Sequence, residues 1–283
     1  ITGKTYHATP FPPLAQDRVL CVGAEVAFIV ATSAEAAEDA AELIHVDYDP
    51  LPVAPTLEAA IAQDAPRVWP EAAGNICFQH CMGDGAATEA AFATAHHITR
   101  ATIRNQRLAG VPMEPRTCIG SYDTAEGRWR LTSSTANPHR IRLLLAENIF
   151  RVPANRIHVT AGDVGGGFGT KGGLYPEEIL VLWAAWRIGR PVKWVSSRSE
   201  SFLADFNGRD QIADAELALD AGGRILALRV HSHANVGAYP TGTGVAIQLL
   251  IGPWVQTSVY HVPVIDFDFK AVLTNQAPTG AYR

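Results

Sequence analysis

Six of the eleven residues from Asp163 to Gly173 are glycine, in the order Asp-Val-Gly-Gly-Gly-Phe-Gly-Thr-Lys-Gly-Gly. A run of glycine costs conformational entropy on folding, so the absence of side chains must serve a structural or functional purpose. The usual gain is that free N–H groups come close to a phosphate or another anionic cofactor. The run lies between an expected strand and an expected helix, which is the arrangement of an anion cradle. Tight turns in a crowded junction are the structural alternative.

Residues Gly167–Gly172 also match the Gly-x-Gly-x-x-Gly pattern of dinucleotide-binding folds. The helix expected after the loop and a strand at Val192–Val195 would complete the βαβ unit that this pattern requires. An arginine after the second strand would suit a phosphorylated dinucleotide, and Arg198 leaves that form open. Phe168 and Lys171 are unusual beside a pyrophosphate. An NADP-dependent Rossmann dehydrogenase using Gly167–Gly172 is therefore an alternative function.

Two other groups of residues have types that bind or position an anion. Arg283 follows the Pro- and Gly-containing segment Asn275–Tyr282, and a guanidinium can clamp an oxyanion with two parallel hydrogen bonds. A solvated arginine is the alternative. Glu114 and Arg116 flank a proline, which predicts either a structural ion pair or part of a site lining, and structure is favoured.

The cysteines and the overall charge exclude several classes of function. Cys21, Cys77, Cys81 and Cys118 form no Cys-x-x-Cys pair and have no histidine at zinc-finger spacing. They are expected to be buried residues in a reducing compartment, which favours the cytoplasm. The net charge of −5 argues against nucleic acid or anionic membrane as the main partner. No apolar run reaches the roughly 18 residues that a membrane helix needs.

The elements around the glycine loop are those of a mixed α/β body. Helices are expected near Ala86–Ala95, from Pro138 to about Phe150, and over Glu177–Ile188, which Gly189 ends. Residues Gln211–Leu219 and Ile225–Ala234 are expected to form a hairpin. Further strands are expected at Ile98–Asn105, Cys118–Tyr122, Arg128–Thr132, Arg156–Ala161, Pro191–Ser197 and Val264–Leu273.

The first 75 residues predict a smaller unit and a connection. Residues 19–31 are expected to form one or two strands, Glu35–Leu43 a helix capped by Ser33, and residues 44–48 a strand, which together make a βαβ-like unit. A short helix is expected from Leu57. The chain begins without Met or a signal-peptide pattern and stops abruptly after a loop, so it is expected to be a fragment. The rest would be either a further part of the same polypeptide or a second polypeptide.

Taken in order along the chain, these segments resemble one family. Asp163–Lys171 resembles the glycine motif of the molybdenum hydroxylases, the xanthine oxidase family, which includes aldehyde oxidoreductases and carbon monoxide dehydrogenase large subunits. The other segments with a resemblance are Pro13–Val19, Val46–Pro52, Asn105–Arg107, Met113–Arg116, Tyr175–Glu178, Gly189–Trp194, Arg198–Phe202 and Thr279–Arg283. The resemblance implies an α+β fold. Residues 1–56 would be the C-terminal part of an α/β-hammerhead domain, 57–74 a linker, and 75–283 the first molybdopterin-cofactor-binding domain.

The resemblance also implies a cofactor, a reaction and partners. Molybdenum would be held through the dithiolene of a molybdopterin cytosine dinucleotide, with no protein ligand. The backbone of Gly165, Gly166, Gly167 and Gly169 would approach the metal's oxo ligand and the pterin, and Phe168 and Arg283 would lie beside the metal. A small carbon-centred substrate (an aldehyde, an N-heterocycle or carbon monoxide) would be oxidised with oxygen from water. Electrons would pass to [2Fe–2S] clusters and FAD on a small and a medium subunit, in a dimer of heterotrimers that includes the rest of the large subunit.

Three departures from the family pattern bear on the site. Ala136 stands where the family often carries a glutamine that hydrogen-bonds the apical oxo group. Whether the side chain of Asn137 substitutes for that glutamine is left open by the sequence. Gly172 stands where purine-oxidising members carry glutamate, which disfavours a xanthine substrate. The general-base glutamate belongs to the family's C-terminal half, so no catalytic residue is assigned here. Ala136 also motivates a third hypothesis, a catalytically inactive homologue that serves as a scaffold.

Overall fold

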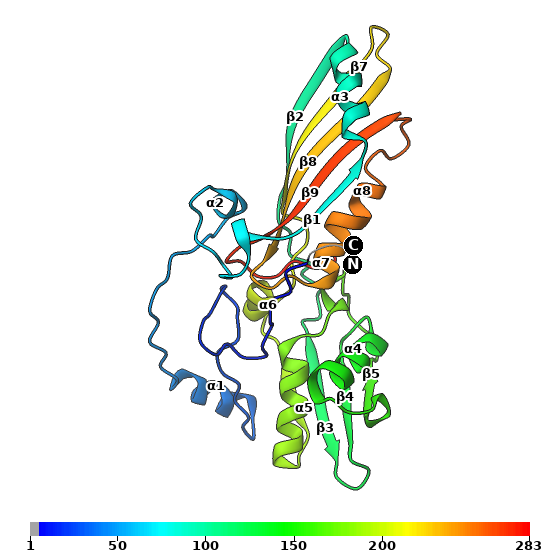
Figure 1. Cartoon of the computed structure of the whole chain (residues 1–283). Coiled ribbons are helices and arrows are strands. Elements are labelled where there is room, and N and C mark those ends of the chain that lie inside the picture. Colours follow the sequence, from blue (N-terminus) through cyan, green and yellow to red (C-terminus); the bar gives the residue numbers. More distant parts are fainter. Residues whose placement is uncertain (1–5) are drawn as a thin grey trace. The chain divides into compact units, whose positions relative to one another are not determined.

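The chain forms two compact units, each built from separate stretches of sequence, in a computed structural model that describes residues 6–283 (Figure 1). Unit 1 comprises the residues up to Pro10, Val53–Ala109 and Phe206–Tyr282. Unit 2 comprises Phe11–Pro52, Gly110–Asp205 and Arg283. The expected mixture of helices and sheets is confirmed. The division into residues 1–56, 57–74 and 75–283 stays a prediction. Its first five residues lie outside the part of the chain that the structure describes.

Unit 1 is built on a five-stranded sheet with the strand order β1-β9-β8-β7-β2. Its strands are β1 (Ile76–Gly83), β2 (His97–Asn105), β7 (Gln211–Leu219), β8 (Ile225–Gly237) and β9 (Val264–Leu273). Neighbouring strands are antiparallel except β8 and β9, which are parallel. The structure confirms the predicted hairpin, as β7 and β8, and the predicted last strand. Phe267 and Val230, which are almost fully buried, mark the apolar face of the sheet.

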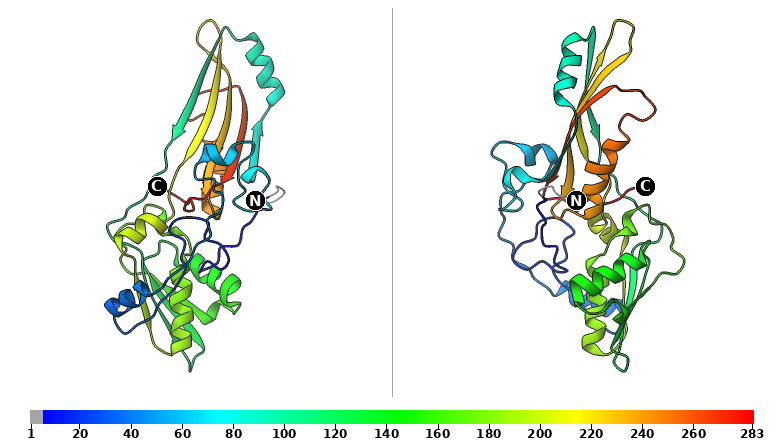
Figure 2. Two further views of the ribbon diagram at one scale, coloured as in Figure 1. Left: turned by 90° about the vertical axis from the view of Figure 1, so that its left-hand side faces the viewer. Right: turned by 45° about the vertical axis from the view of Figure 1, so that its right-hand side comes forward.

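Short helices flank this sheet in the views of Figure 2. They are α2 (Leu57–Ile61), α3 (Gly85–Thr94), α7 (Gly242–Ala246) and α8 (Gly252–Trp254), with a 3-10 helix η1 (Ala73–Asn75) and a π-helix η5 (Ile247–Ile251). The carboxylate of Asp84 caps α3 by accepting the N–H of Ala87. Phe92 on α3 packs against Ala218 and Ala227 of the sheet.

Unit 2 is built on a four-stranded sheet with the order β5-β4-β3-β6. Its strands are β3 (Thr117–Asp123), β4 (Arg128–Ser133), β5 (Ile157–Thr160) and β6 (Val192–Val195). Its helices are α1 (Ala34–Glu42), α4 (Pro138–Leu144), α5 (Pro176–Ile188) and α6 (Arg198–Ala204), with a π-helix η2 (Leu145–Phe150) and the 3-10 helices η3 (Ala154–Arg156) and η4 (Thr170–Gly172). Those of these elements that lie between residues 117 and 195 match the strands and helices expected there.

Helix α5 packs tightly on β3 and builds the core of unit 2. A Cβ on Gly120 of β3 would lie 2.7 Å from the backbone carbonyl of Val181, so only glycine allows this approach. The core of this unit comprises Trp129, Leu131, Ile141, Leu145, Ile157, Val181 and Leu182, among other residues. Because α5 follows the glycine loop, this packing fixes one end of the loop.

The βαβ-like unit expected in the first 50 residues does not form. Helix α1 exists and Ser33 caps it, as predicted. The segments 19–31 and 44–48 are not strands, because neither finds a hydrogen-bonding partner strand among residues 6–283. Apolar side chains that a sheet would cover, such as Val22 and Tyr48, are exposed. Among the described residues, no helix has the length and apolar character needed to cross a membrane.

Candidate functional site

The glycine loop lies in unit 2 and connects β5 to α5. Gly166 and Gly169 have φ angles of 95° and 98°, a region that side chains with a Cβ rarely adopt. Phe168 adopts a φ of 47°, which is uncommon for a bulky residue, and its side chain is 47% exposed. The loop therefore holds a strained, exposed aromatic residue between two left-handed glycines.

Three successive backbone N–H groups in this loop are free. Those of Gly167, Phe168 and Gly169 have no hydrogen-bond acceptor in the part of the chain that the structure describes. The neighbouring N–H groups are engaged: that of Gly166 donates to the carbonyl of Val164 at 2.8 Å, and that of Thr170 to the carbonyl of Gly167 at 2.8 Å. A row of unengaged donors with no side chain on two of the three residues is a cradle for an anionic or oxo-bearing group.

Arg283 lies beside this cradle. Its N–H donates to the carbonyl of Phe168 at 2.9 Å, and its guanidinium carbon is 6.0 Å from the centroid of the Phe168 ring. The structure therefore brings Arg283 next to the glycine run and its Phe168, although Arg283 lies more than 100 residues further along the chain. A cation and three N–H donors on one small surface suit a ligand with negative charge.

The side chain of Ala136 has no hydrogen-bonding group, and its backbone lies under the loop. Its N–H donates to the carbonyl of Lys171 at 2.9 Å, and the hydroxyl of Thr135 donates to the same carbonyl at 3.2 Å. The side-chain oxygen of Asn137 accepts the N–H of Arg140 as the cap of α4. The segment Thr135–Asn137 therefore anchors the end of the loop and caps a helix.

Glu114 contacts the start of the loop. Its carboxylate accepts the N–H of Gly165, and one of its oxygens lies 3.4 Å from the Nζ of Lys171. A Cβ on Gly165 would lie 2.6 Å from the Cβ of Glu114, so this glycine is required by the fold itself. Burial lowers the pKa of Lys171, and the Glu114 carboxylate opposes that shift. The ion pair expected between Glu114 and Arg116 is absent from the described ion pairs, because each residue has other partners.

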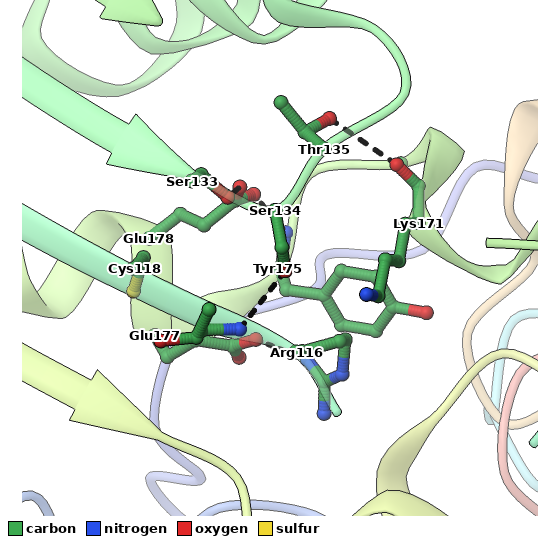
Figure 3. A pocket seen from close by; sticks show the side chains of 11 residues that line it. Arg116, Cys118, Ser133, Ser134, Thr135, Lys171, Tyr175, Glu177 and Glu178 are labelled. Carbon is green, nitrogen blue, oxygen red and sulfur yellow. Dashed lines mark hydrogen bonds and ion pairs between the residues drawn. The ribbon is translucent and has the colours of Figure 1, made fainter. Parts of the chain in front are cut away.

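Arg116 is the centre of a buried ionic network (Figure 3). Its guanidinium pairs with the carboxylates of Glu177 and of Asp205, the latter at 2.7 Å, and all three side chains are at most 7% exposed. Its guanidinium carbon also lies 3.7 Å from the centroid of the Tyr175 ring. The hydroxyl of Tyr175 donates to the carbonyl of Thr170 at 2.9 Å, so this network reaches the glycine loop.

Glu178 lines the same cleft as Arg116 and Lys171 (Figure 3). Its carboxylate accepts the hydroxyl of Ser133 at 2.6 Å and the N–H of Tyr175 at 3.1 Å. Burial raises the pKa of Glu178 to about 7. The sequence placed Glu177 and Glu178 at the start of an expected helix and in a segment that resembles the family, without indicating their partners. Their pairing with Arg116 and Ser133 depends on contacts across 45 to 61 positions, which no local pattern carries.

The dinucleotide alternative does not match this geometry. The glycine pattern leads into η4, and α5 begins only at Pro176, so no long helix points its N-terminus at Gly167–Gly172. The start of α5 is occupied by its own carboxyl groups, since Glu178 accepts the N–H of Tyr175 at 3.1 Å and Glu177 pairs with Arg116. Arg198, the residue that left the NADP form open, donates to the backbone carbonyl of Met113 at 2.7 Å.

The cysteines form no disulfide among the described residues. Cys21, Cys77 and Cys118 are buried, as predicted, whereas Cys81 is exposed on β1. Residues 6–283 contain no group of three or more histidine, cysteine or acidic side chains arranged to hold a metal ion. A metal carried on an organic cofactor needs no such group of protein ligands.

Comparison with known proteins identifies the family. The sequence model described as "Molybdopterin cofactor-binding domain" matches residues 68–283, and the one for the a/b hammerhead domain of aldehyde oxidase and xanthine dehydrogenase matches residues 2–52. The chain is 35% identical to the 6-hydroxypseudooxynicotine dehydrogenase complex subunit gamma of Paenarthrobacter nicotinovorans and 35% identical to the carbon monoxide dehydrogenase large chain of Afipia carboxidovorans. These matches cover 96% and 95% of this chain and 34% and 35% of the relatives.

Solved structures give the same answer. The chain resembles quinoline 2-oxidoreductase from Pseudomonas putida 86 with a TM-score of 0.90 and 35% identity, over 97% of this chain and 35% of that one. The chain thus spans about a third of the length of the relatives that it matches. It belongs to the molybdopterin cofactor-binding domain family of the molybdenum hydroxylases, the xanthine oxidase family.

Proposed function

We propose that this chain forms part of a molybdenum hydroxylase large subunit and holds its cofactor at the glycine loop. The observation that carries the proposal is the row of free N–H groups at Gly167, Phe168 and Gly169, with Arg283 beside it. These groups suit the oxo and pterin parts of a molybdenum cofactor, since they offer donors without side chains in the way. When bound, the cofactor supplies the two-electron oxidation of a substrate carbon with oxygen from water.

The residues of this chain would bind and orient in that reaction. Gly165 and Gly166 shape the loop, Phe168 presents an exposed ring that a planar substrate can contact, and Arg283 adds a positive charge. Ala136 contributes its backbone beneath the loop and no side-chain donor. We place the general base outside this chain, as the family resemblance implies. The carboxylate of Glu114, which contacts the loop, is already paired with Gly165 and Lys171.

We infer the finer points from the family. The substrate would be a small carbon-centred molecule, an aldehyde, an N-heterocycle or carbon monoxide. The cofactor would be the cytosine dinucleotide form, and small [2Fe–2S] and medium FAD subunits would take the electrons in a cytoplasmic dimer of heterotrimers. The names of relatives support a multi-subunit assembly, since they include a complex subunit gamma and a large chain.

Metal and pterin analysis of the protein purified in its complex tests the proposal. We expect about one molybdenum and one pterin per chain, and loss of both in Arg283→Met. Arg128→Met is the matched control, because Arg128 is an exposed arginine of unit 2 that pairs with Glu126 away from the loop. A folded wild-type complex without molybdenum and without pterin would refute the proposal and favour a scaffold.

A further inference from the structure

Glu114 holds the glycine loop by three separate contacts. Its carboxylate accepts the N–H of Gly165, its own N–H donates to the carbonyl of Gly165 at 3.3 Å, and a carboxylate oxygen lies 3.4 Å from the Nζ of Lys171. Gly165 and Lys171 lie on either side of the free N–H groups of Gly167–Gly169. One side chain therefore bridges the two flanks of the cradle.

The charge of Lys171 makes this bridge necessary. The Lys171 side chain is only 1% exposed, and Glu114 is its ion-pair partner at 3.4 Å. Among the described residues its Nζ has no partner at hydrogen-bond geometry. Without Glu114, a buried ammonium would lie beside the loop with no carboxylate of the described residues within ion-pair distance, which is unfavourable.

The other end of the loop has separate anchors. The Tyr175 hydroxyl donates to the carbonyl of Thr170, and Thr135 and Ala136 donate to the carbonyl of Lys171. No other side chain of the described residues hydrogen-bonds the loop backbone between Gly165 and Gly169. Glu114 is therefore the one side-chain anchor of this half among the described residues, beside the backbone hydrogen bond from Arg283 to the carbonyl of Phe168.

We propose that Glu114 is a positioning residue that locks the first half of the loop, so that the N–H groups of Gly167, Phe168 and Gly169 stay free to receive the cofactor. The naming of the ligand rests on the proposed function, but the lock itself concerns this chain alone. Glu114 acts through the loop, so its effect is visible in the protein before the cofactor is bound.

Hydrogen exchange of the loop, followed by mass spectrometry on the cofactor-depleted complex, tests the lock. Lys171→Met removes the buried charge, and in that background Glu114→Gln keeps an acceptor for Gly165 whereas Glu114→Leu, of similar size, has none. We expect the hydrogen-bonded amides of the first half of the loop, those of Gly165 and Gly166, to exchange about tenfold faster with leucine than with glutamine, which corresponds to about 1.4 kcal/mol. Residues 170–173 and the β7–β8 hairpin should exchange at equal rates in both variants.

Two further measurements make the outcome decisive. The single variant Glu114→Leu should lose more stability than the double variant with Lys171→Met, because only the single variant leaves an unpaired buried ammonium. Equal exchange of the Gly165 and Gly166 amides in the leucine and glutamine variants would overturn the lock. Molybdenum content, measured on the same proteins before depletion, reports separately on the proposed function, so either idea can fail without the other.

Discussion

Replacing Arg116 with methionine should destabilise unit 2 strongly. Methionine is close to arginine in length but leaves the carboxylates of Glu177 and Asp205 buried without their cation. Removing one partner of a buried ion pair costs about 3–5 kcal/mol, and the contact of Arg116 with the Tyr175 ring adds about 0.5–2 kcal/mol. Together these contributions are about 3.5–7 kcal/mol, and a loss of about 5 kcal/mol lowers the melting temperature of a domain of this size by about 10–20 °C.

Thermal unfolding followed by tryptophan fluorescence measures this loss. Unit 2 contains Trp129, Trp183, Trp186 and Trp194, so its unfolding changes the signal. The triple variant Arg116→Met with Glu177→Gln and Asp205→Asn removes the stranded charges and should recover most of the stability. The explanation by unpaired charge is refuted if the single variant loses less than about 1 kcal/mol, or if the triple variant melts no higher than the single one.

Three further results are expected. The pKa of Glu178 is about 7 in the folded state against an ordinary value of 4.5, so the folded state binds this proton more tightly than the unfolded state. Protonated Glu178 therefore contributes to the free energy of unfolding; the contribution is complete below pH 4.5 and is lost as the pH rises through 7. Denaturation at several pH values should show that Glu178→Gln removes roughly 3 kcal/mol of this dependence. Gly237→Ala should destabilise unit 1 far more than Gly223→Ala in urea titrations: both have positive φ, but only at Gly237 would a Cβ overlap the carbonyl of Ala277. A thiol reagent should label Cys81 under native conditions and spare Cys118, whose pKa burial raises.

Local sequence patterns predicted the elements of unit 2 and missed its ionic network. Proline at the start of α4 and glycine after α5 fix the ends of helices by rules that act within a few residues. Arg116 meets Glu177 and Asp205 only because β3, α5 and α6 pack together, which depends on the whole fold. The same reason explains why the strands predicted in residues 19–31 do not form. Their composition favours strands, but a strand also needs a neighbouring strand to hydrogen-bond with, which composition does not supply.

The glycine run illustrates how far one motif can be interpreted. Read as a ligand cradle, every glycine is attributed to the cofactor. The structure divides them: Gly165 makes room for Glu114, Gly166 and Gly169 supply left-handed turns, and Gly167 meets only ordinary contacts from the chain itself. Three of the six glycines are therefore accounted for by internal packing or backbone conformation before any ligand arrives. It follows that a glycine motif at a junction of this kind identifies a site only together with its neighbours. Here Glu114 engages the N–H of Gly165 and leaves those of Gly167–Gly169 free, and Arg283 adds a positive charge beside them.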